Sequence, residues 1–285
     1  MPKQRSLNQV EAHHQAKADE EACLCFTVVM SQSTVPNILA VIPARYASTR
    51  FPGKPLVDIQ GKPMLQHVWE RVRQVKSIAR VIVATDDARI EAAAHQFGAE
   101  VQLTSEEHPS GTDRIWEVTH SLPDYDWILN VQGDEPFINP EHLSQAIAAI
   151  TTHPTADIIT LVTPLTNAED WQNPNIVKAV LTEQGRALYF SRAAIPYHRD
   201  EPGHPQSVFR HLGLYLYRRA ALSKFTQLPP SPLENLEKLE QLRALEAGMS
   251  IYAVVVDKAP IGIDTPEDLV RLQDVEQHGF PILKK

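Results

Sequence analysis

The chain has 285 residues, a formal net charge of −8 and a hydrophobic content of 43%. This composition is typical of a globular protein with a buried core, and it excludes a disordered or fibrous chain. The acidic balance argues against a broad basic surface for nucleic acid, so a phosphate-bearing ligand would need local cations or a metal ion.

Residues 1–36 are predicted to form a poorly ordered extension. Their longest apolar stretch, residues 22–30, is far shorter than the roughly 20 residues that span a bilayer. It follows an acidic run, which is the wrong flank for a secretory signal. The two cysteines, Cys23 and Cys25, suggest neither a disulfide framework nor a zinc site. We therefore expect a cytoplasmic protein without membrane insertion.

From residue 37 onward, short apolar runs alternate with segments of helical period. This alternation predicts the α/β class, with a mostly parallel twisted sheet and helices on both faces. The expected strands are residues 38–42, 81–85, 101–104, 127–131 and 158–162. The expected helices between them are residues 63–75, 87–96, 111–121 and 140–151.

After residue 163 the alternation loosens and prolines divide the chain into shorter pieces. We expect a smaller inserted lobe at about residues 164–230 within a main domain of residues 37–276, followed by a tail at 277–285. Further elements are expected as strands at 212–217 and 251–256, a helix at 233–247 and a last helix after Thr265-Pro266.

A cationic loop, residues 43–55, directly follows the first predicted strand. It carries Arg45, Arg50 and Lys54 on a backbone stiffened by prolines. Open α/β sheets bind ligands beyond the carboxyl ends of their strands, and arginine and lysine both suit phosphate. The loop lacks the glycine patterns of Walker and dinucleotide-binding loops. It predicts a phosphate-binding loop, and the alternative is a solvated basic loop.

Two aspartates are candidate metal ligands. Asp134 follows Gln132 and Gly133 at the end of the strand predicted at 127–131, and Asp264 precedes the last predicted helix. Mg²⁺ prefers one or two carboxylates together with phosphate oxygens, so these two side chains would suit it. The alternatives are a plain turn at Asp134 and a helix cap by the residue that follows Asp264.

The remaining signals are weaker. Thr85-Asp86 ends a predicted strand, and Ser110-Gly111 opens a predicted helix, where Ser110 is either a cap or, with the exposed N–H groups, a ligand contact. Arg192 and His211 lie beside apolar runs, and a lone histidine is more often structural. Glu237 and Glu240 could be the solvated flank of a leucine stripe. For these residues the sequence leaves both structural and binding roles open.

Taken together, the segments resemble the 3-deoxy-manno-octulosonate cytidylyltransferases, also called CMP-Kdo synthetases, over about residues 38–276. The resemblance is carried by PARYASTRFPGKPL (43–56), ATDD (84–87), HPSGTDR (108–114), NVQGDEP (130–136), NPNIVKAV (173–180), ALYFSRAAIP (187–196), RHLGLYLYR (210–218), LEQLRALEAG (239–248) and GIDTPEDL (262–269). As an ordered set these motifs are specific, whereas single ones also occur in related sialate cytidylyltransferases.

The resemblance implies a nucleotide-diphospho-sugar transferase-like fold whose smaller lobe binds the sugar and takes part in a homodimer. It implies transfer of CMP from CTP to the anomeric hydroxyl of Kdo, release of pyrophosphate, Mg²⁺ as cofactor and a place in lipopolysaccharide biosynthesis. The residues implied for CTP are Arg45, Ser48, Arg50, Lys54, Thr85, Asp86, Ser110, Gly111 and Gln132. Those implied for the sugar are Arg192, His211, Tyr215, Glu240 and Gln241. Asp134 and Asp264 would hold the metal, and with Lys54, Arg45 and Arg50 they would be catalytic.

Two other functions stay open on the sequence alone. One is a cytidylyltransferase for sialic acid or another acidic sugar, and the other is a catalytically silent CTP-binding module. An NAD-dependent oxidoreductase is disfavoured because its glycine fingerprint is absent.

Overall fold

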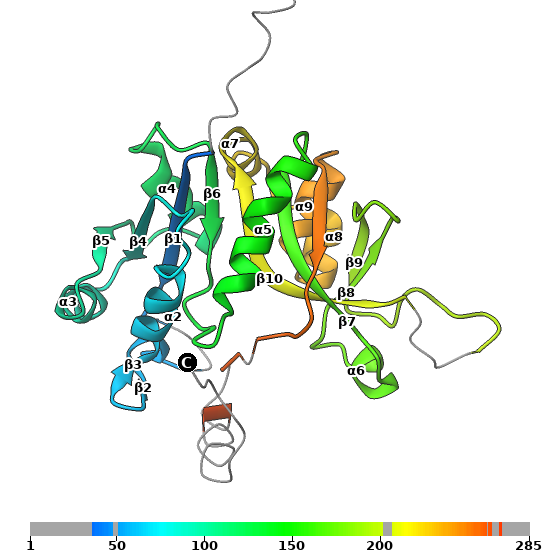
Figure 1. Cartoon of the computed structure of the whole chain (residues 1–285), viewed down its shortest axis with the longest axis horizontal. Coiled ribbons are helices and arrows are strands. Elements are labelled where there is room, and N and C mark those ends of the chain that lie inside the picture. Colours follow the sequence, from blue (N-terminus) through cyan, green and yellow to red (C-terminus); the bar gives the residue numbers. More distant parts are fainter. Residues whose placement is uncertain (1–35, 48–50, 202–206, 261, 264–267, 270–285) are drawn as a thin grey trace, which may run out of the picture. The chain divides into compact units, whose positions relative to one another are not determined.

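A nine-stranded sheet forms the centre of the fold in the computed structural model, which describes residues 36–47, 51–201, 207–260, 262–263 and 268–269 (Figure 1). The strands on its main path run in the order β11-β7-β10-β6-β1-β4-β5, and β8 pairs with β10 and β9. Their bounds are β1 (Ile38–Ala44), β4 (Arg80–Thr85), β5 (Glu100–Leu103), β6 (Trp127–Asn130), β7 (Ile158–Pro164), β8 (Lys178–Leu181), β9 (Ala187–Ser191), β10 (Phe209–Arg218) and β11 (Ile251–Val255). A separate hairpin joins β2 (Asp58–Ile59) and β3 (Lys62–Pro63).

Helices connect most of the strands of the main path. They are η1 (Lys54–Leu56), α2 (Met64–Val72), α3 (Ala88–Gln96), α4 (Gly111–His120), α5 (Pro140–Thr152), α6 (Ala168–Gln172), α7 (Arg219–Thr226), α8 (Pro232–Glu237) and α9 (Gln241–Glu246). Asp87, Ser110 and Asn139 cap α3, α4 and α5 by accepting a backbone N–H in the first turn. Such caps satisfy donors that the helix itself leaves unpaired.

The predicted α/β class is confirmed, with a mostly parallel sheet covered by helices on both faces. The single helix predicted at 233–247 is wrong, because Lys238 adopts φ 53 and divides it into α8 and α9. The sequence did not predict α6, α7, β8 and β9. Several expectations lie outside the described residues: the extension at 1–35, the tail at 277–285, most of the last helix, and the side chains of Ser48, Arg50 and Asp264.

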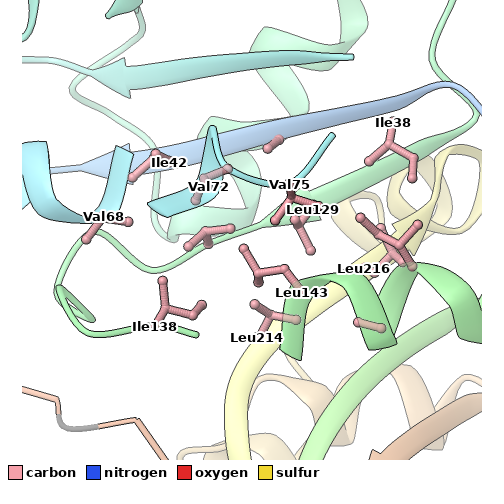
Figure 2. Close-up of a cluster of buried hydrophobic side chains, with 14 of the residues drawn as sticks. Ile38, Ile42, Val68, Val72, Val75, Leu129, Ile138, Leu143, Leu214 and Leu216 are labelled. Carbon is pink, nitrogen blue, oxygen red and sulfur yellow. The ribbon is translucent and has the colours of Figure 1, made fainter. Parts of the chain in front are cut away.

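Alternation along the central strand divides the core into two layers. Ile38 and Ile42 point to one face of the sheet and pack with α2 and α5 (Figure 2). Leu39 and Val41 point to the other face and pack with α4, α7 and α9. Because successive side chains of a strand point to opposite faces, a strand with helices on both sides is apolar throughout. The helices are thus anchored on both faces and leave the strand ends for the site.

Strand β10 runs against its neighbours and so brings its first half to the edge where other strands end. On the main path it is antiparallel to β6 and β7, whereas the other pairs are parallel. Phe209 lies opposite Pro164 at the end of β7, and Tyr215 lies opposite Asn130 at the end of β6. The residues between Phe209 and Tyr215 therefore reach the carboxyl edge of the parallel strands.

Among the described residues, none of the helices has the length and apolar character needed to cross a membrane.

Candidate active site

Two loops meet backbone to backbone at the carboxyl edge of the sheet. One follows β1 and the other follows β6. A Cβ atom on Gly133 would lie 2.9 Å from the carbonyl oxygen of Pro43, closer than real Cβ contacts come. Glycine is therefore required for the second loop to pass this near to the first. This approach brings the cationic loop and the segment of Asp134 together.

Lys54 and Asp134 form an ion pair, with 2.8 Å between the Lys54 Nζ and the Asp134 Oδ2. Lys54 is 8% exposed and begins η1, while Asp134 keeps 42% of its side-chain surface exposed. Before the lysine, Gly53 adopts φ 72 and lies against the ring of Tyr46, which a Cβ would approach to 3.1 Å. The turn at Gly53 thus directs the ammonium group toward a solvent-accessible carboxylate.

The surroundings of Asp134 suit a magnesium ion. The backbone N–H of Ile263 donates to the carbonyl oxygen of Asp134 at 3.4 Å, so the segment that leads into Asp264 lies beside this loop. In the described ranges no three or more His, Cys, Asp and Glu side chains lie together in a way that could hold a metal ion. Mg²⁺ does not need such a cluster, since it keeps waters and combines one or two carboxylates with phosphate oxygens. Asp134 is thus a carboxylate of the kind that Mg²⁺ takes as a ligand, and it lies next to the segment of Ile263.

Arg45 connects the first loop to the beginning of α4. Its Nη2 donates to the carbonyl oxygens of His108 and Ser110, each at 2.7 Å. Burial lowers the pKa of the Arg45 guanidinium, and the positive charge of Arg114 adds to this effect. Arg45 thus has a role in holding the 108–110 loop, which the sequence did not suggest.

Arg114 is fully buried and pairs with two groups at the predicted cytidine side. Its Nη2 forms an ion pair with Asp86, and its Nη1 donates to Thr104. Thr104 in turn donates to the carbonyl oxygen of Thr85 at 3.1 Å. Arg114 lies inside the motif HPSGTDR, but the motif alone assigned it no role. The signal was a basic residue one turn after the predicted cap of α4.

The other residues predicted for cytidine also lie at this end of the sheet. Ser110 caps α4 by accepting the N–H of Asp113 at 3.2 Å, so the structural alternative for it holds in this structure. Gly111 begins that helix beside the ring of Pro43. Gln132 follows β6, and its Nε2 donates to the Oδ1 of Asn130 at 3.5 Å.

Glu240 joins the helix that Ser110 caps to the second half of the chain. Its Oε2 accepts a hydrogen bond of 2.8 Å from the Thr112 hydroxyl. The other oxygen, Oε1, is buried and has no hydrogen-bond partner among the described atoms. Burial raises the pKa of the Glu240 carboxyl. The idea of a solvated flank is therefore wrong for Glu240.

A directional chain of hydrogen bonds continues from the residue after Glu240. Tyr215 donates to the Gln241 Oε1 at 3.1 Å, and the Gln241 Nε2 lies 3.4 Å from the His211 Nδ1. The His211 Nε2 lies 2.9 Å from the Thr160 hydroxyl, which itself donates to a backbone carbonyl. Burial lowers the pKa of His211 to about 3. The chain is satisfied by a neutral imidazole that accepts at Nδ1 and donates at Nε2.

Arg192 lies at the end of β9 against the break between α8 and α9. Its Nε donates to the carbonyl oxygen of Glu237 at 2.7 Å and its Nη1 to that of Pro174 at 2.9 Å. The Glu237 carboxylate accepts from the Ser191 hydroxyl and from the N–H of Arg192. Glu237 is therefore not merely solvated. Its contacts fix Arg192 beside a residue that lies three positions before Glu240 in the sequence.

The described candidate residues are thus linked by contacts into one array. The cationic loop meets Asp134, Arg45 meets the start of α4, and α4 meets Glu240 and its neighbours. The structure brings these residues together, while their individual roles in binding and catalysis stay predictions. It adds Thr112, Arg114 and Glu237, which sequence reasoning had not assigned.

The fold agrees with the comparisons to known proteins. Residues 39–251 match the family model described as cytidylyltransferase, which gives the class of the protein. A 3-deoxy-manno-octulosonate cytidylyltransferase of Syntrophotalea carbinolica is 53% identical over 83% of this chain and 97% of its own length. One of Cytophaga hutchinsonii is 49% identical over 83% and 96%. The chain belongs to the 3-deoxy-manno-octulosonate cytidylyltransferase family, as the resemblance predicted.

A solved structure extends the agreement to three dimensions. It is a CMP:2-keto-3-deoxy-manno-octonic acid synthetase complexed with CTP, 42% identical to this chain, with a TM-score of 0.80. The match covers 85% of this chain and 99% of that one.

Proposed function

We propose that the protein transfers CMP from CTP to the anomeric hydroxyl of Kdo, releases pyrophosphate and so supplies lipopolysaccharide biosynthesis. The hydrogen bond between Thr112 and Glu240 is the observation that carries this proposal, because it joins the helix of the nucleotide side to the acceptor side. The curated relatives with 53% and 49% identity carry the corresponding name.

The nucleotide would lie across the carboxyl edge of the sheet. Lys54, Arg45, Ser48 and Arg50 would face the phosphates, and Thr85, Asp86, Ser110, Gly111 and Gln132 would line the cytidine pocket. Lys54 is suited to this task because its buried ammonium group already lies against a carboxylate at the exposed side of the loop. A cation held there stabilises negative charge without reorganisation during the reaction.

The reaction would be an in-line attack of the sugar's anomeric hydroxyl on the α-phosphorus of CTP. The new bond joins that oxygen to phosphorus, the bond to the β-phosphate oxygen breaks, and pyrophosphate leaves. Such transfers depend on positioning and on neutralising charge rather than on covalent chemistry by the protein. Lys54, Arg45 and Arg50 would stabilise the charge of the departing pyrophosphate.

Asp134 and Asp264 would hold Mg²⁺, which when bound supplies a positive charge for the triphosphate and lowers the pKa of an oxygen that it coordinates. In the structure the Asp134 Oδ2 accepts a 2.8 Å hydrogen bond from the Lys54 ammonium group, so the proposal requires that this contact rearranges when the ion binds. Ile263, the residue that precedes Asp264 in the sequence, lies beside the Asp134 loop through its hydrogen bond to the Asp134 carbonyl oxygen.

The acceptor sugar would lie near the start of β10. Arg192 would face the sugar carboxylate, for which a planar guanidinium is well suited. The hydroxyl groups of the sugar would be bound by His211, Tyr215, Glu240 and Gln241. The chain from Tyr215 to His211 is neutral, since burial lowers the pKa of the imidazole and raises that of the phenol. Recognition of the negative charge of the sugar carboxylate would therefore depend on Arg192.

The test is release of pyrophosphate from CTP and Mg²⁺ with three acceptors, namely Kdo, its 8-amino analogue and sialic acid. We expect turnover with Kdo to exceed turnover with sialic acid. A preference for sialic acid would replace the proposed acceptor, and binding of CTP in calorimetry without turnover on any acceptor would indicate a silent CTP-binding module.

We also infer a cytoplasmic homodimer, in keeping with the family resemblance. The smaller lobe at about 164–230 would contribute to dimerisation. Sedimentation of the purified protein would give its oligomeric state.

A further inference from the structure

Lys178 is a buried cation that the site described so far does not use. It begins β8 and is 0% exposed. Its Nζ donates to three carbonyl oxygens, those of Asn173 at 2.8 Å, Ile176 at 2.5 Å and Arg192 at 2.6 Å. An ammonium group has three N–H donors, so all of them are satisfied by backbone. We refer to this arrangement as the Lys178 clamp.

The charge of Lys178 is costly where it lies. Burial lowers its pKa, and the positive charge of Arg192 adds to this, while Glu237 acts in the opposite direction. The ion pairs of the described chain include none between Lys178 and a carboxylate. A well-packed apolar residue is often at least as stabilising as a buried charge, so stability alone is a weak reason for a lysine here.

The clamp acts on the backbone of Arg192 from one side, and Glu237 acts on it from the other. The Glu237 Oε2 accepts the N–H of Arg192 at 2.9 Å, and Lys178 donates to the carbonyl oxygen of Arg192. The two polar groups of this residue's backbone are thus each held by a buried or half-buried charged side chain. Hydrogen bonds to charged groups are shorter and stronger than those between neutral groups.

The clamp also holds the loop against which the Arg192 guanidinium rests. Lys178 fixes the carbonyls of Asn173 and Ile176, and the Arg192 Nη1 donates to the carbonyl of Pro174 between them. Nε and Nη2 donate to the carbonyls of Glu237 and Lys238. A guanidinium has five N–H donors, so these three contacts leave two for a bidentate acceptor such as a carboxylate.

We propose that Lys178 is a positioning residue for the acceptor subsite, where it fixes the backbone and the supporting loop of Arg192 so that the guanidinium meets a sugar carboxylate. This inference rests on the proposed function, because Arg192 is assigned there to the acidic acceptor. Lys178 itself does not touch the substrate.

The first experiment compares Lys178→Met with Lys76→Met, which replaces an exposed lysine. For Lys178→Met we expect KM for the sugar to rise about tenfold and KM for CTP to change by less than about twofold, the pattern of lost acceptor binding. Lys76→Met should leave both values unchanged. An equal rise of KM for both substrates would overturn the proposal, since it would indicate a general structural role.

A double-mutant cycle separates action through Arg192 from an independent effect. In an Arg192→Ala background, Lys178→Met should change kcat/KM for the sugar by less than about twofold, because residues that act as a unit are not additive. If the effects of the two single substitutions on kcat/KM instead multiply in the double variant, the proposal is overturned. Should Lys178→Met not fold, Lys178→Arg decides in its place: it keeps the charge, but its planar fork cannot satisfy the three carbonyls, and an unchanged KM for the sugar would overturn the clamp.

Amide hydrogen exchange tests the Lys178 clamp independently of the proposed function. Faster exchange of the segment containing residues 191–193 in the Lys178 variant, but not in Lys76→Met, is expected whichever sugar is the substrate. Absence of turnover by the wild-type protein with Kdo would refute the proposed acceptor only. Unchanged exchange of this segment would refute the clamp.

Discussion

The Thr112 hydroxyl donates a 2.8 Å hydrogen bond to the Glu240 carboxylate, across 128 residues of sequence. Thr112 lies in the first turn of α4, two residues after the cap, and Glu240 immediately precedes α9. The bond leaves Glu240 with one buried oxygen that has no partner among the described atoms. Since buried polar atoms are nearly always paired, this oxygen is a candidate acceptor for a ligand hydroxyl.

Glu240→Gln tests that assignment. The amide keeps one oxygen for Thr112 but replaces the other by a donor, so we expect KM for the sugar to rise about tenfold while KM for CTP stays within about twofold. Burial raises the pKa of Glu240, so the neutral amide should not lower stability. Glu183→Gln, at an exposed glutamate, is the control. An unchanged KM for the sugar would exclude Glu240 from acceptor binding.

Asp134→Ala should abolish most of the Mg²⁺-dependent release of pyrophosphate. The substitution removes a proposed metal ligand and the partner of Lys54, and we expect kcat to fall at least about 100-fold. Asp124→Ala, at an exposed aspartate in a turn, should keep wild-type turnover. Full activity of the Asp134 variant would falsify its assigned role.

Arg114→Met should destabilise the fold more than it affects the acceptor site. The substitution leaves Asp86 without its partner in a largely buried ion pair, and breaking such a pair costs about 3 kcal/mol. Urea denaturation measures the loss. The double variant with Asp86→Asn should recover part of it, because no unpaired charge then remains. A double variant no more stable than Arg114→Met would argue that the pairing with Asp86 is unimportant.

The buried imidazole of His211 should make the free energy of unfolding depend on pH. Burial lowers its pKa from the ordinary 6.5 to about 3 in the fold, so between these values the unfolded chain binds more protons. Stability is therefore present above pH 6.5 and is lost as the pH falls through this window, with a slope of at most about 1.4 kcal/mol per pH unit. His211→Asn should flatten the slope relative to wild type, while His120→Asn, at an exposed histidine, should not. Equal slopes in thermal or urea unfolding would contradict the buried neutral imidazole.

Gly133→Ala should damage the site by steric contact. The added methyl would lie 2.9 Å from the Pro43 carbonyl, and neither backbone can move aside without displacing its strand end. We expect a loss of about 1–3 kcal/mol in the free energy of unfolding and a clear loss of turnover. Gly213→Ala is the matched control, because nothing lies within 4 Å of its added Cβ. Similar behaviour of the two variants would mean that the loops can separate.

Much of the sheet was predictable because its strands are apolar on both faces. The run that begins at Ile38 is buried along almost its whole length, which gives a continuous hydrophobic signal. Strands β8 and β9 gave no such signal, since their buried and partly exposed positions are mixed. The helix at 233–247 was predicted as one piece because its leucines continue through the break. Lys238 divides it by adopting a left-handed conformation, which no local sequence pattern predicts.

The site was predictable to the extent that its residues lie in motifs at strand ends. Lys54 and Asp134 were found in this way, and the structure pairs them. Thr112 and Lys178 were not assigned, because their partners are a carboxylate 128 residues away and three backbone carbonyls. Contacts of this kind leave no periodic or compositional mark. The assignments of Ser48, Arg50 and Asp264 remain predictions, since these residues lie outside the described part of the chain.

The reversed direction of β10 bears on how acceptor preference could diverge among relatives. The strand enters the sheet at the ligand edge and reaches the interior of the core from Leu212 onward. Phe209 and Arg210, which are only partly buried, can therefore vary with the sugar, while Leu216 and its neighbours are constrained by packing. Relatives that accept different acidic sugars should differ at the beginning of this strand and agree at its end.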